Sequence, residues 1–361
     1  MSEPRIMSSS FPSLRAHRLP PAASAARAAI GLERWRDQAR QGGDSTLIRF
    51  ADRVAADPAG RALLESVFGN SPFLSHCLIN EPALLSSFLA EGGDAVCDEL
   101  VAGLAAAAPA AADPAALMRL LRVTRRRWAL AVALADLIGL WPLDKITDRL
   151  SQLAEAALGI AADHLLARAE ARGEVALADP ARPSRDSGLI IIGMGKLGSR
   201  ELNYSSDIDL IILYDPAKVV YRGRRTMQDF FVRLARDLVG LLERRTADGY
   251  VFRTDLLLRP DPASTPLALS VLAAETYYEG MGQNWERAAM IKARAVAGDI
   301  AAGTAFLAGL RPFVWRKHLD FAAIQDIHSI KRQIHAVRGQ RDVAVAGHNI
   351  KLGRGGIREI E

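Results

Sequence analysis

The stretch GMGKLGSRELNYSSDIDLIILYD, residues 193–215, decides the fold of this chain. Its first six residues fit the dinucleotide-binding pattern G-x-G-x-x-G, and Asp215 lies about 20 residues further on, where a ribose-binding carboxylate is expected. The same stretch also holds Asp207 and Asp209, which a dinucleotide loop does not need. The sequence therefore offers two hypotheses, a dinucleotide-binding loop or a site built on paired aspartates.

The two aspartates lie at the start of a predicted strand, DIDLIILY. Side chains alternate between the faces of a strand, so Asp207 and Asp209 point the same way while Ile208 and Leu210 point into the core. Two neighbouring carboxylates repel each other unless a cation lies between them. Mg²⁺ prefers oxygen ligands, commonly one or two carboxylates together with phosphates and water, so the pair predicts a magnesium site.

A third carboxylate, Asp255, interrupts another predicted strand, YVFRTDLLLR. A charge in an apolar run is costly unless it is paired or binds a metal. If this strand lies beside the first, Asp207, Asp209 and Asp255 form a cluster suited to holding metal ions around a transferring phosphoryl group. In the alternative without a metal, Asp207 caps its strand, Asp209 faces solvent, and Asp255 pairs with Arg253 or Arg259.

The glycines have a role under either hypothesis. A tight turn at residues 193–198, followed by a short helix from about Ser199, presents backbone N–H groups to a phosphate. The connection separates the hypotheses, because only eight residues lie between Gly198 and Asp207. A crossover between parallel strands takes a helix and at least about 10 to 12 residues, so the spacing disfavours the dinucleotide hypothesis.

Helical sequence surrounds this region. Residues 1–25 are rich in Ser, Pro, Arg and Ala and predict a flexible tail. Residues 26–178 have apolar positions three and four apart, which predicts a helical domain that includes a long amphipathic helix over Leu143–Ala171. Residues 186–270 predict a small α/β core, and residues 271–361 a C-terminal helical lobe. The predicted fold class is α+β and predominantly helical.

Within the core, apolar runs bounded by turn residues predict three strands, and helical spacing predicts one helix. The strands are residues 189–193, 207–214 and 250–259, and the helix is residues 226–245. After Ser270 the pattern returns to helix, including the segment GQNWERAAMIKARAVAGD. The chain stops at GGIREIE inside a patterned segment, so we expect it to be a fragment of a longer protein.

Composition excludes several classes of protein. The net charge of the 361 residues is +5, which permits contact with phosphate or an acidic partner but does not require nucleic acid. The longest apolar run, WALAVALADLIGLW, falls short of the roughly 20 residues that a membrane span needs. Two cysteines without metal-ligand spacing fit a reducing compartment. We therefore expect a cytoplasmic protein that makes no membrane contact.

Four motifs resemble one known family. GMGKLGSRELNYSSDIDLI resembles the glycine turn and aspartate pair of the DNA polymerase β-type nucleotidyltransferase superfamily. With FRTDLLLRPDPASTPLALS, GQNWERAAMIKARAVAGD and NIKLGRGGIREIE, it is similar to the glutamine synthetase adenylyltransferase/adenylyl-removing enzymes. The resemblance covers nearly the whole chain except the tail and implies a polymerase β-like core.

The resemblance also implies an activity. Members of the family carry two nucleotidyltransferase units, of which the N-terminal one removes AMP from a tyrosine of glutamine synthetase by phosphorolysis, giving ADP. The C-terminal unit attaches AMP from ATP. This chain has one catalytic motif and resembles the adenylyl-removing unit. The implied cofactor is Mg²⁺, and the implied partners are glutamine synthetase, the PII signalling protein, inorganic phosphate, ADP or ATP, and glutamine as an effector.

The resemblance assigns roles to residues. Asp207 and Asp209 would bind metal, and Asp255 would bind metal or act as a general acid/base toward the tyrosine oxygen. The residues that would hold nucleotide phosphates are Gly195, Lys196, Gly198 and Ser199. Three basic residues, Arg259, Lys292 and Arg294, would position a phosphate, or else they are solvated or salt-bridged charges.

Three other functions stay open at this point. A non-catalytic module could bind glutamine synthetase or PII through its helices. A dinucleotide-binding oxidoreductase would use the glycine loop, and basicity alone would also allow a nucleotidyltransferase that acts on nucleic acid. The run Arg125 to Arg127 is most simply a solvated helix face, or else a basic patch for an acidic regulator.

Overall fold

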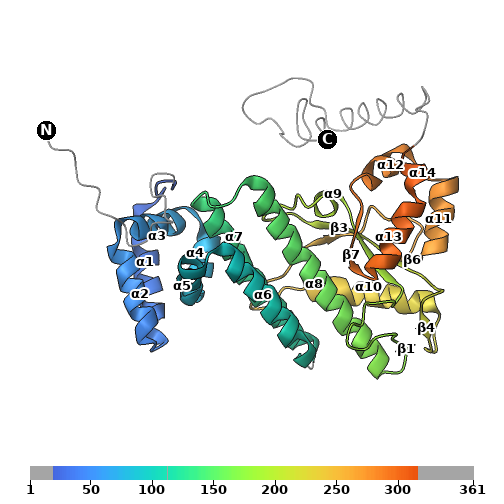
Figure 1. The fold of residues 1–361 in the computed structure, drawn as a ribbon, viewed down its shortest axis with the longest axis horizontal. Helices are drawn as coiled ribbons and strands as arrows, with labels where there is room; N and C mark the ends of the chain where they lie inside the picture. Colours follow the sequence, from blue (N-terminus) through green and yellow to red (C-terminus); the bar gives the residue numbers. More distant parts are fainter. Residues whose placement is uncertain (1–18, 112, 316–361) are drawn as a thin grey trace, which may run out of the picture.

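A computed structural model describes residues 19–111 and 113–315 of the chain. It confirms the predicted fold class, because the chain is mostly helical and one small mixed sheet lies at the end of the molecule away from α1–α5, residues 25–91 (Figure 1). Residues 1–18 of the predicted tail and residues 316–361 of the predicted lobe, with the motif NIKLGRGGIREIE, lie outside the described residues. Along the described ranges, no helix is both long and apolar enough to cross a membrane.

Seven helices form the N-terminal part of the described chain, where the apolar spacing predicted helix. Their starts follow capping rules: Asp57, for example, ends α2 and accepts hydrogen bonds from the backbone N–H groups of Ala59 and Gly60 at 3.0 and 2.9 Å, which begins α3. Proline occupies the first turn of α3, α4, α5 and α7. The helices are α1 Ala25–Gln41, α2 Ser45–Ala56, α3 Pro58–Asn70, α4 Pro72–Asn80, α5 Pro82–Glu91, α6 Gly93–Ala107 and α7 Pro114–Leu137, and a 3₁₀ turn, Ala108–Ala110, follows α6.

Two features of this part differ from the sequence-based expectation. Residues 19–24, expected in the tail, are held against α3, where Asn70 donates to the Pro21 carbonyl at 3.0 Å. The run Arg125 to Arg127 is only partly solvated, because Arg127 is exposed whereas Arg125 and Arg126 are half-buried. Arg126 and Arg127 donate to the two carboxylate oxygens of the buried Glu81 at 2.6 and 2.7 Å. Arg125 lies over the ring of Tyr250.

The long helix α8, Leu143–Ala171, has the predicted bounds. Its buried face includes small residues, Ala154, Ala157 and Ala161, which let neighbouring elements approach closely. The helix packs against α7 on one side and against the sheet and α10 on the other (Figure 1). It therefore connects the helical part of the chain to the sheet that carries the aspartates.

The sheet has five short strands in the order β5-β3-β2-β7, with β6 also paired to β3. Strand β2 runs antiparallel to β3 and β7, whereas β5 and β6 pair with β3 in parallel. The strands are β2 Leu189–Gly193, β3 Ile208–Tyr214, β5 Thr254–Asp255, β6 Ala268–Ser270 and β7 Arg294–Gly298; β1 Val175–Ala176 and β4 Val220–Tyr221 form a separate ribbon.

Strand β7 corrects the prediction of helix after Ser270. The segment around it was expected to be helical, but only α12, Asn284–Met290, is a helix there, and residues 294–298 join the sheet. The sequence RAVAG has small side chains and no alternating pattern, so its strand state depends on pairing with β2. The predicted third strand is also shorter, because only two of its ten residues pair as β5.

Apolar residues cover both faces of the sheet. Leu210 and Ile212 of β3 belong to the core that includes α8 and α10, whereas Ile211 and Leu213 belong to the core beneath the C-terminal helices. Asp209 continues the row of Ile211 and Leu213, so it lies on the face of the C-terminal helices. These helices are α11 Val271–Gly280, α12, α13 Ile300–Gly309 and α14 Arg311–Val314, and α10 is Met227–Glu243.

Candidate functional site

The strand directions remove the dinucleotide hypothesis. Strands β2 and β3 are antiparallel, with Gly193 opposite Leu210, so the glycine turn does not belong to a parallel crossover. Asp215 follows the end of β3 that pairs with the start of β2, and its backbone N–H donates to the Gly188 carbonyl at 2.8 Å. It therefore lies at the opposite end of the strand from the glycine turn.

The glycine turn itself is one turn of helix, α9, Gly195–Gly198. It begins earlier than predicted, so Ser199 caps its C-terminus rather than starting it. Gly195 has φ +51°, and a Cβ atom there would lie 3.0 Å from the Oδ2 atom of Asp209. Gly195 is needed both for its backbone conformation and for the close approach of the Asp209 carboxylate.

Gly198 is needed for packing. A Cβ atom there would lie 1.8 Å from the carbonyl oxygen of Lys292, just before β7. Arg294 of β7 donates to the Gly198 and Leu197 carbonyls at 3.0 Å each and to Glu155 of α8 at 2.5 Å. Gly198 and Arg294 thus hold α9 against β7 and α8.

The aspartates on β3 and β5 lie side by side. The two strands are parallel, and Asp209 is the register partner of Asp255, so their side chains share one face. The Oδ1 atom of Asp255 accepts the Leu257 backbone N–H at 2.7 Å, which turns the chain directly after the strand. The predicted proximity of these two strands is confirmed.

Asp207 is held by a cation. Its Oδ1 atom accepts from the Nε atom of Arg253 at 2.5 Å, and the same arginine donates to the Ser205 carbonyl at 2.9 Å. Both side chains of the ion pair are 51% exposed. The Asp207 carboxylate raises the pKa of Arg253 through this hydrogen bond. In the described ranges, no three acidic, histidine or cysteine side chains are close enough together to bind a metal ion.

The other two predicted basic residues, Arg259 and Lys292, also have protein partners. Arg259 is buried, and its guanidinium donates to the carbonyls of Leu256 and Pro262 at 2.8 Å each and to Pro266 at 3.1 Å, so it holds the loop after β5 together. Burial lowers its pKa. The Nζ atom of Lys292 donates to Glu201 at 3.2 Å. Arg259 therefore shapes the loop, and Lys292 lies beside the glycine turn.

Lys196 and Ser199 line an open cavity of about 1160 Å³ between the glycine turn and the start of α8. Its wall carries charges of both signs, among them Asp148 and Arg200. The Ser199 hydroxyl donates to the Gly195 carbonyl at 3.0 Å and lies 2.9 Å from a Glu201 oxygen. Lys196 is exposed at the rim of this cavity.

Sequence reasoning missed one support of the site. Glu243, in the last turn of α10, accepts the backbone N–H of Thr254 at 2.5 Å and its hydroxyl at 2.9 Å. This carboxylate fixes β5 directly beside Asp255. No local pattern marks Glu243, since its partner lies 11 residues away across a turn.

The sequence predicted a cluster of three carboxylates beside a glycine turn. The structure places Asp209 and Asp255 on neighbouring strands there, whereas Asp207 is bound to Arg253. The family model described as glutamate-ammonia ligase adenylyltransferase matches residues 61–309. Because this match covers more than half of the chain, the chain belongs to that family.

Curated relatives agree with the family model. The bifunctional glutamine synthetase adenylyltransferase/adenylyl-removing enzyme of Rhizobium meliloti (strain 1021) is 53% identical over 317 residues, 86% of this chain and 32% of the relative. The protein of the same name from Brucella suis biovar 1 is 51% identical over 299 residues, 82% of this chain and 30% of the relative. The one from Rhodopseudomonas palustris (strain BisB5) is 45% identical over 355 residues, 95% of this chain and 36% of the relative.

The chain spans about a third of the length of these relatives. The matched portion of each relative is its N-terminal portion.

Proposed function

We propose that this chain removes AMP from adenylylated glutamine synthetase by phosphorolysis. An oxygen of inorganic phosphate attacks the phosphorus of the AMP-O-tyrosine group, the bond from phosphorus to the phenolic oxygen breaks, and ADP and a free tyrosine form. The names of the relatives contain both the protein substrate and the removing activity. The match to their N-terminal portion favours removal over attachment as the reaction of this chain.

The observation that carries the proposal is the pairing of Asp209 with Asp255 beside Gly195. Two carboxylates on one face are the donors that Mg²⁺ prefers, so the chemistry of these side chains fits this metal. Asp207 directly precedes β3 and is bound to Arg253, so it would join the pair only when that ion pair opens. A bound Mg²⁺ would neutralise charge on the transferring phosphoryl group.

The leaving phenolate needs a proton or an equivalent positive charge, because the ordinary pKa of a tyrosine phenol is about 10. In the described part of the chain no hydrogen bond reaches the Oδ2 atom of Asp255, whereas Oδ1 holds the Leu257 N–H. This division leaves one oxygen of Asp255 for a metal or for a proton in transit to the phenol oxygen.

The glycine turn is proposed to hold the phosphates. The first backbone N–H groups of α9 have no acceptor within the helix, and Lys196 and Ser199 lie beside them at the cavity. Gly195 and Gly198 let this turn approach the carboxylates and β7. Lys292, which donates to Glu201 just after the turn, could attract inorganic phosphate, while Arg259 and Arg294 act through the loop and the turn that they hold.

The direct test is to mix this chain with adenylylated glutamine synthetase, inorganic phosphate and Mg²⁺ and to measure ADP. We expect ADP with the wild-type chain and much less with Asp207→Asn. Transfer of AMP from ATP to unmodified glutamine synthetase, without ADP release from the adenylylated form, would show that the chain is the attaching unit.

A second candidate is a non-catalytic module that binds glutamine synthetase or PII through the N-terminal helices. It predicts partner binding that neither Mg²⁺ nor an aspartate substitution changes. The catalytic proposal includes glutamine synthetase as substrate, PII and glutamine as effectors of the longer protein, and the cytoplasm as its compartment. Pull-down with glutamine synthetase, with and without Asp207→Asn, separates the two candidates.

A further inference from the structure

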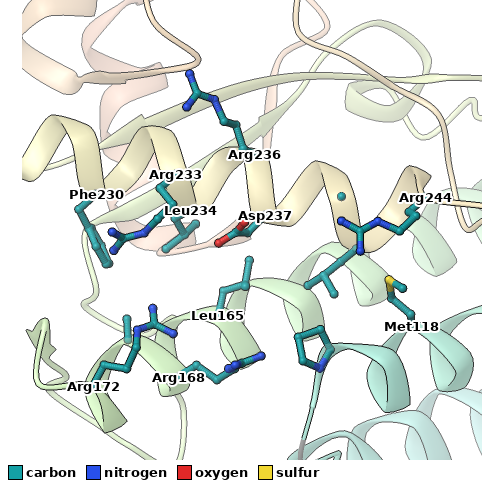
Figure 2. Close-up of a pocket in the computed structure, with 14 residues that line it drawn as sticks. Met118, Leu165, Arg168, Arg172, Phe230, Arg233, Leu234, Arg236, Asp237 and Arg244 are labelled. Carbon is teal, nitrogen blue, oxygen red and sulfur yellow. The ribbon is translucent and has the colours of Figure 1, made fainter.

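A second charged site lies on the opposite face of the sheet from the aspartates. A cavity of about 250 Å³ lies between α8 and α10 (Figure 2). Apolar side chains, among them Met118, Leu165 and Phe230, form part of its wall. Five arginines line it as well, namely Arg168, Arg172, Arg233, Arg236 and Arg244, and we call this cavity the arginine pocket; the guanidinium of Arg236 points away from the cavity (Figure 2). Its one acidic lining residue is Asp237.

Most of this positive charge is not compensated by the protein. Glu174 accepts from Arg172 at 2.8 Å and from Arg233 at 2.6 Å. Within residues 19–111 and 113–315, Arg168, Arg236 and Arg244 form no ion pair. Some arginines elsewhere on α7 and α8 do find carboxylates, as Arg126 and Arg149 show. The arginine pocket is therefore a local excess of cations.

Helix ends explain only part of this excess. Arg168 lies in the last turn of α8 and Arg244 caps the end of α10, where cations interact favourably with the helix dipole. Arg233 and Arg236 lie in the middle of α10, where no such effect acts. Like charges gathered around one cavity repel each other, and a bound anion would remove this repulsion.

We propose that the arginine pocket binds a small organic polyanion that carries phosphate or carboxylate groups. Guanidinium groups donate paired hydrogen bonds that match both kinds of oxyanion. The apolar wall would contact the carbon skeleton of the ligand. The cavity is smaller than the roughly 300–1,000 Å³ of pockets for drug-sized ligands, so it suits a small metabolite rather than a folded acidic partner.

The test is calorimetric titration of the 361-residue chain with inorganic pyrophosphate and, separately, with succinate, at constant ionic strength set by NaCl and without divalent metal. We expect saturable binding of at least one probe. Comparing the two probes separates phosphate from carboxylate recognition. The double variant Arg168→Ala, Arg244→Ala should lose about tenfold or more in affinity, because each arginine supplies charge-assisted hydrogen bonds.

Two matched variants locate the binding. Arg34→Ala removes an exposed arginine of α1 far from the pocket and should leave the affinity unchanged. Asp237→Asn removes the acidic group of the pocket and should raise the affinity. Substituting Arg168 and Arg244 by Lys keeps the charge but loses the planar fork, so an intermediate affinity is expected.

The proposal is overturned if neither probe binds, or if the double alanine variant binds as tightly as the wild type. The second outcome would place the anion elsewhere, for example at the glycine turn. Circular dichroism and thermal melting check that each variant is folded. If the alanine variant is unfolded, the lysine and Asp237→Asn variants decide, and an unchanged affinity in both rejects the pocket. If the melting temperature of the alanine variant falls and neither probe binds to the wild type, the arginines only stabilise the helix ends.

Discussion

The carboxylate site and the arginine pocket lie on the two sides of one sheet and differ in how their charges are held. In the carboxylate site, strand register aligns Asp209 with Asp255, and Gly195 of the glycine turn lies close to the Asp209 carboxylate. In the arginine pocket, long side chains from two helices surround a cavity, and Glu174 binds two of them. Strand pairing positions a few short side chains closely, as catalysis requires, whereas helix surfaces gather longer and more adaptable ones.

One helix connects the two regions. The last turn of α10 carries Glu243, which holds Thr254 of β5, and next to it Arg244, which lines the arginine pocket. Arg122 of α7 donates to the carbonyls of Leu241 and Arg244 and so fixes the same helix end. Substitutions on either side can therefore show whether the two regions act independently.

The largest effect is expected from Asp209→Asn. The change keeps the size of the side chain but removes the charge that faces the glycine turn, so ADP formation should fall by about a thousandfold. The affinity of the arginine pocket for pyrophosphate should stay unchanged. Equal loss of both would contradict the separation of the two regions.

Gly198→Ala should strongly destabilise the chain through the glycine turn beside the carboxylate site. The added Cβ atom would overlap the Lys292 carbonyl, which belongs to the backbone and cannot move aside alone, so we expect a loss of about 3 kcal/mol in unfolding free energy. Gly159→Ala is the matched control, because no atom lies within 4 Å of its Cβ position on α8. It should stabilise the chain by about 0.5–1 kcal/mol in urea denaturation. Equal stability of the two variants would contradict the packing role of Gly198.

Arg122→Met tests the helix end that both regions share. Arg122 is buried, and burial lowers its pKa. The substitution leaves carbonyls at the end of α10 without their donor, which should cost about 2 kcal/mol in unfolding free energy. Arg34→Met, at an exposed position, should cost much less. Pyrophosphate affinity should also fall in the Arg122 variant, although this residue does not line the arginine pocket. An unchanged affinity would show that the end of α10 does not shape the pocket.

The smallest effect is expected from Arg253→Ala. Without its cation, Asp207 is available to a metal, so the affinity for Mn²⁺, used as a spectroscopic probe for Mg²⁺, should rise about two- to fivefold, as expected for an exposed ion pair. Arg253→Lys retains a charge and should bind Mn²⁺ about as the wild type does. A weaker affinity in the alanine variant would mean that Arg253 supports the carboxylates instead of competing with the metal.

Much of the architecture could be predicted from local pattern. The helix at Leu143–Ala171 and the strand at Leu189–Gly193 have the predicted bounds. Apolar residues at helical spacing specify the helix, and a short apolar run bounded by turn residues specifies the strand. Strand β7 could not be predicted, since its residues are small and become a strand only by pairing with β2. The same holds for Arg259, whose acceptors are loop carbonyls that no sequence pattern reveals.

The sequence by itself determined that a glycine turn precedes two aspartates on a strand and that a third aspartate interrupts a later apolar run. Periodicity and charge in neighbouring residues carry this information. Only the tertiary structure decided that Asp255 is the register partner of Asp209, that Asp207 is bound by Arg253, and that Gly198 packs on Lys292. The reason is physical: each of these contacts joins segments that are distant in the chain, and strand pairing and backbone packing, rather than local propensity, bring them together.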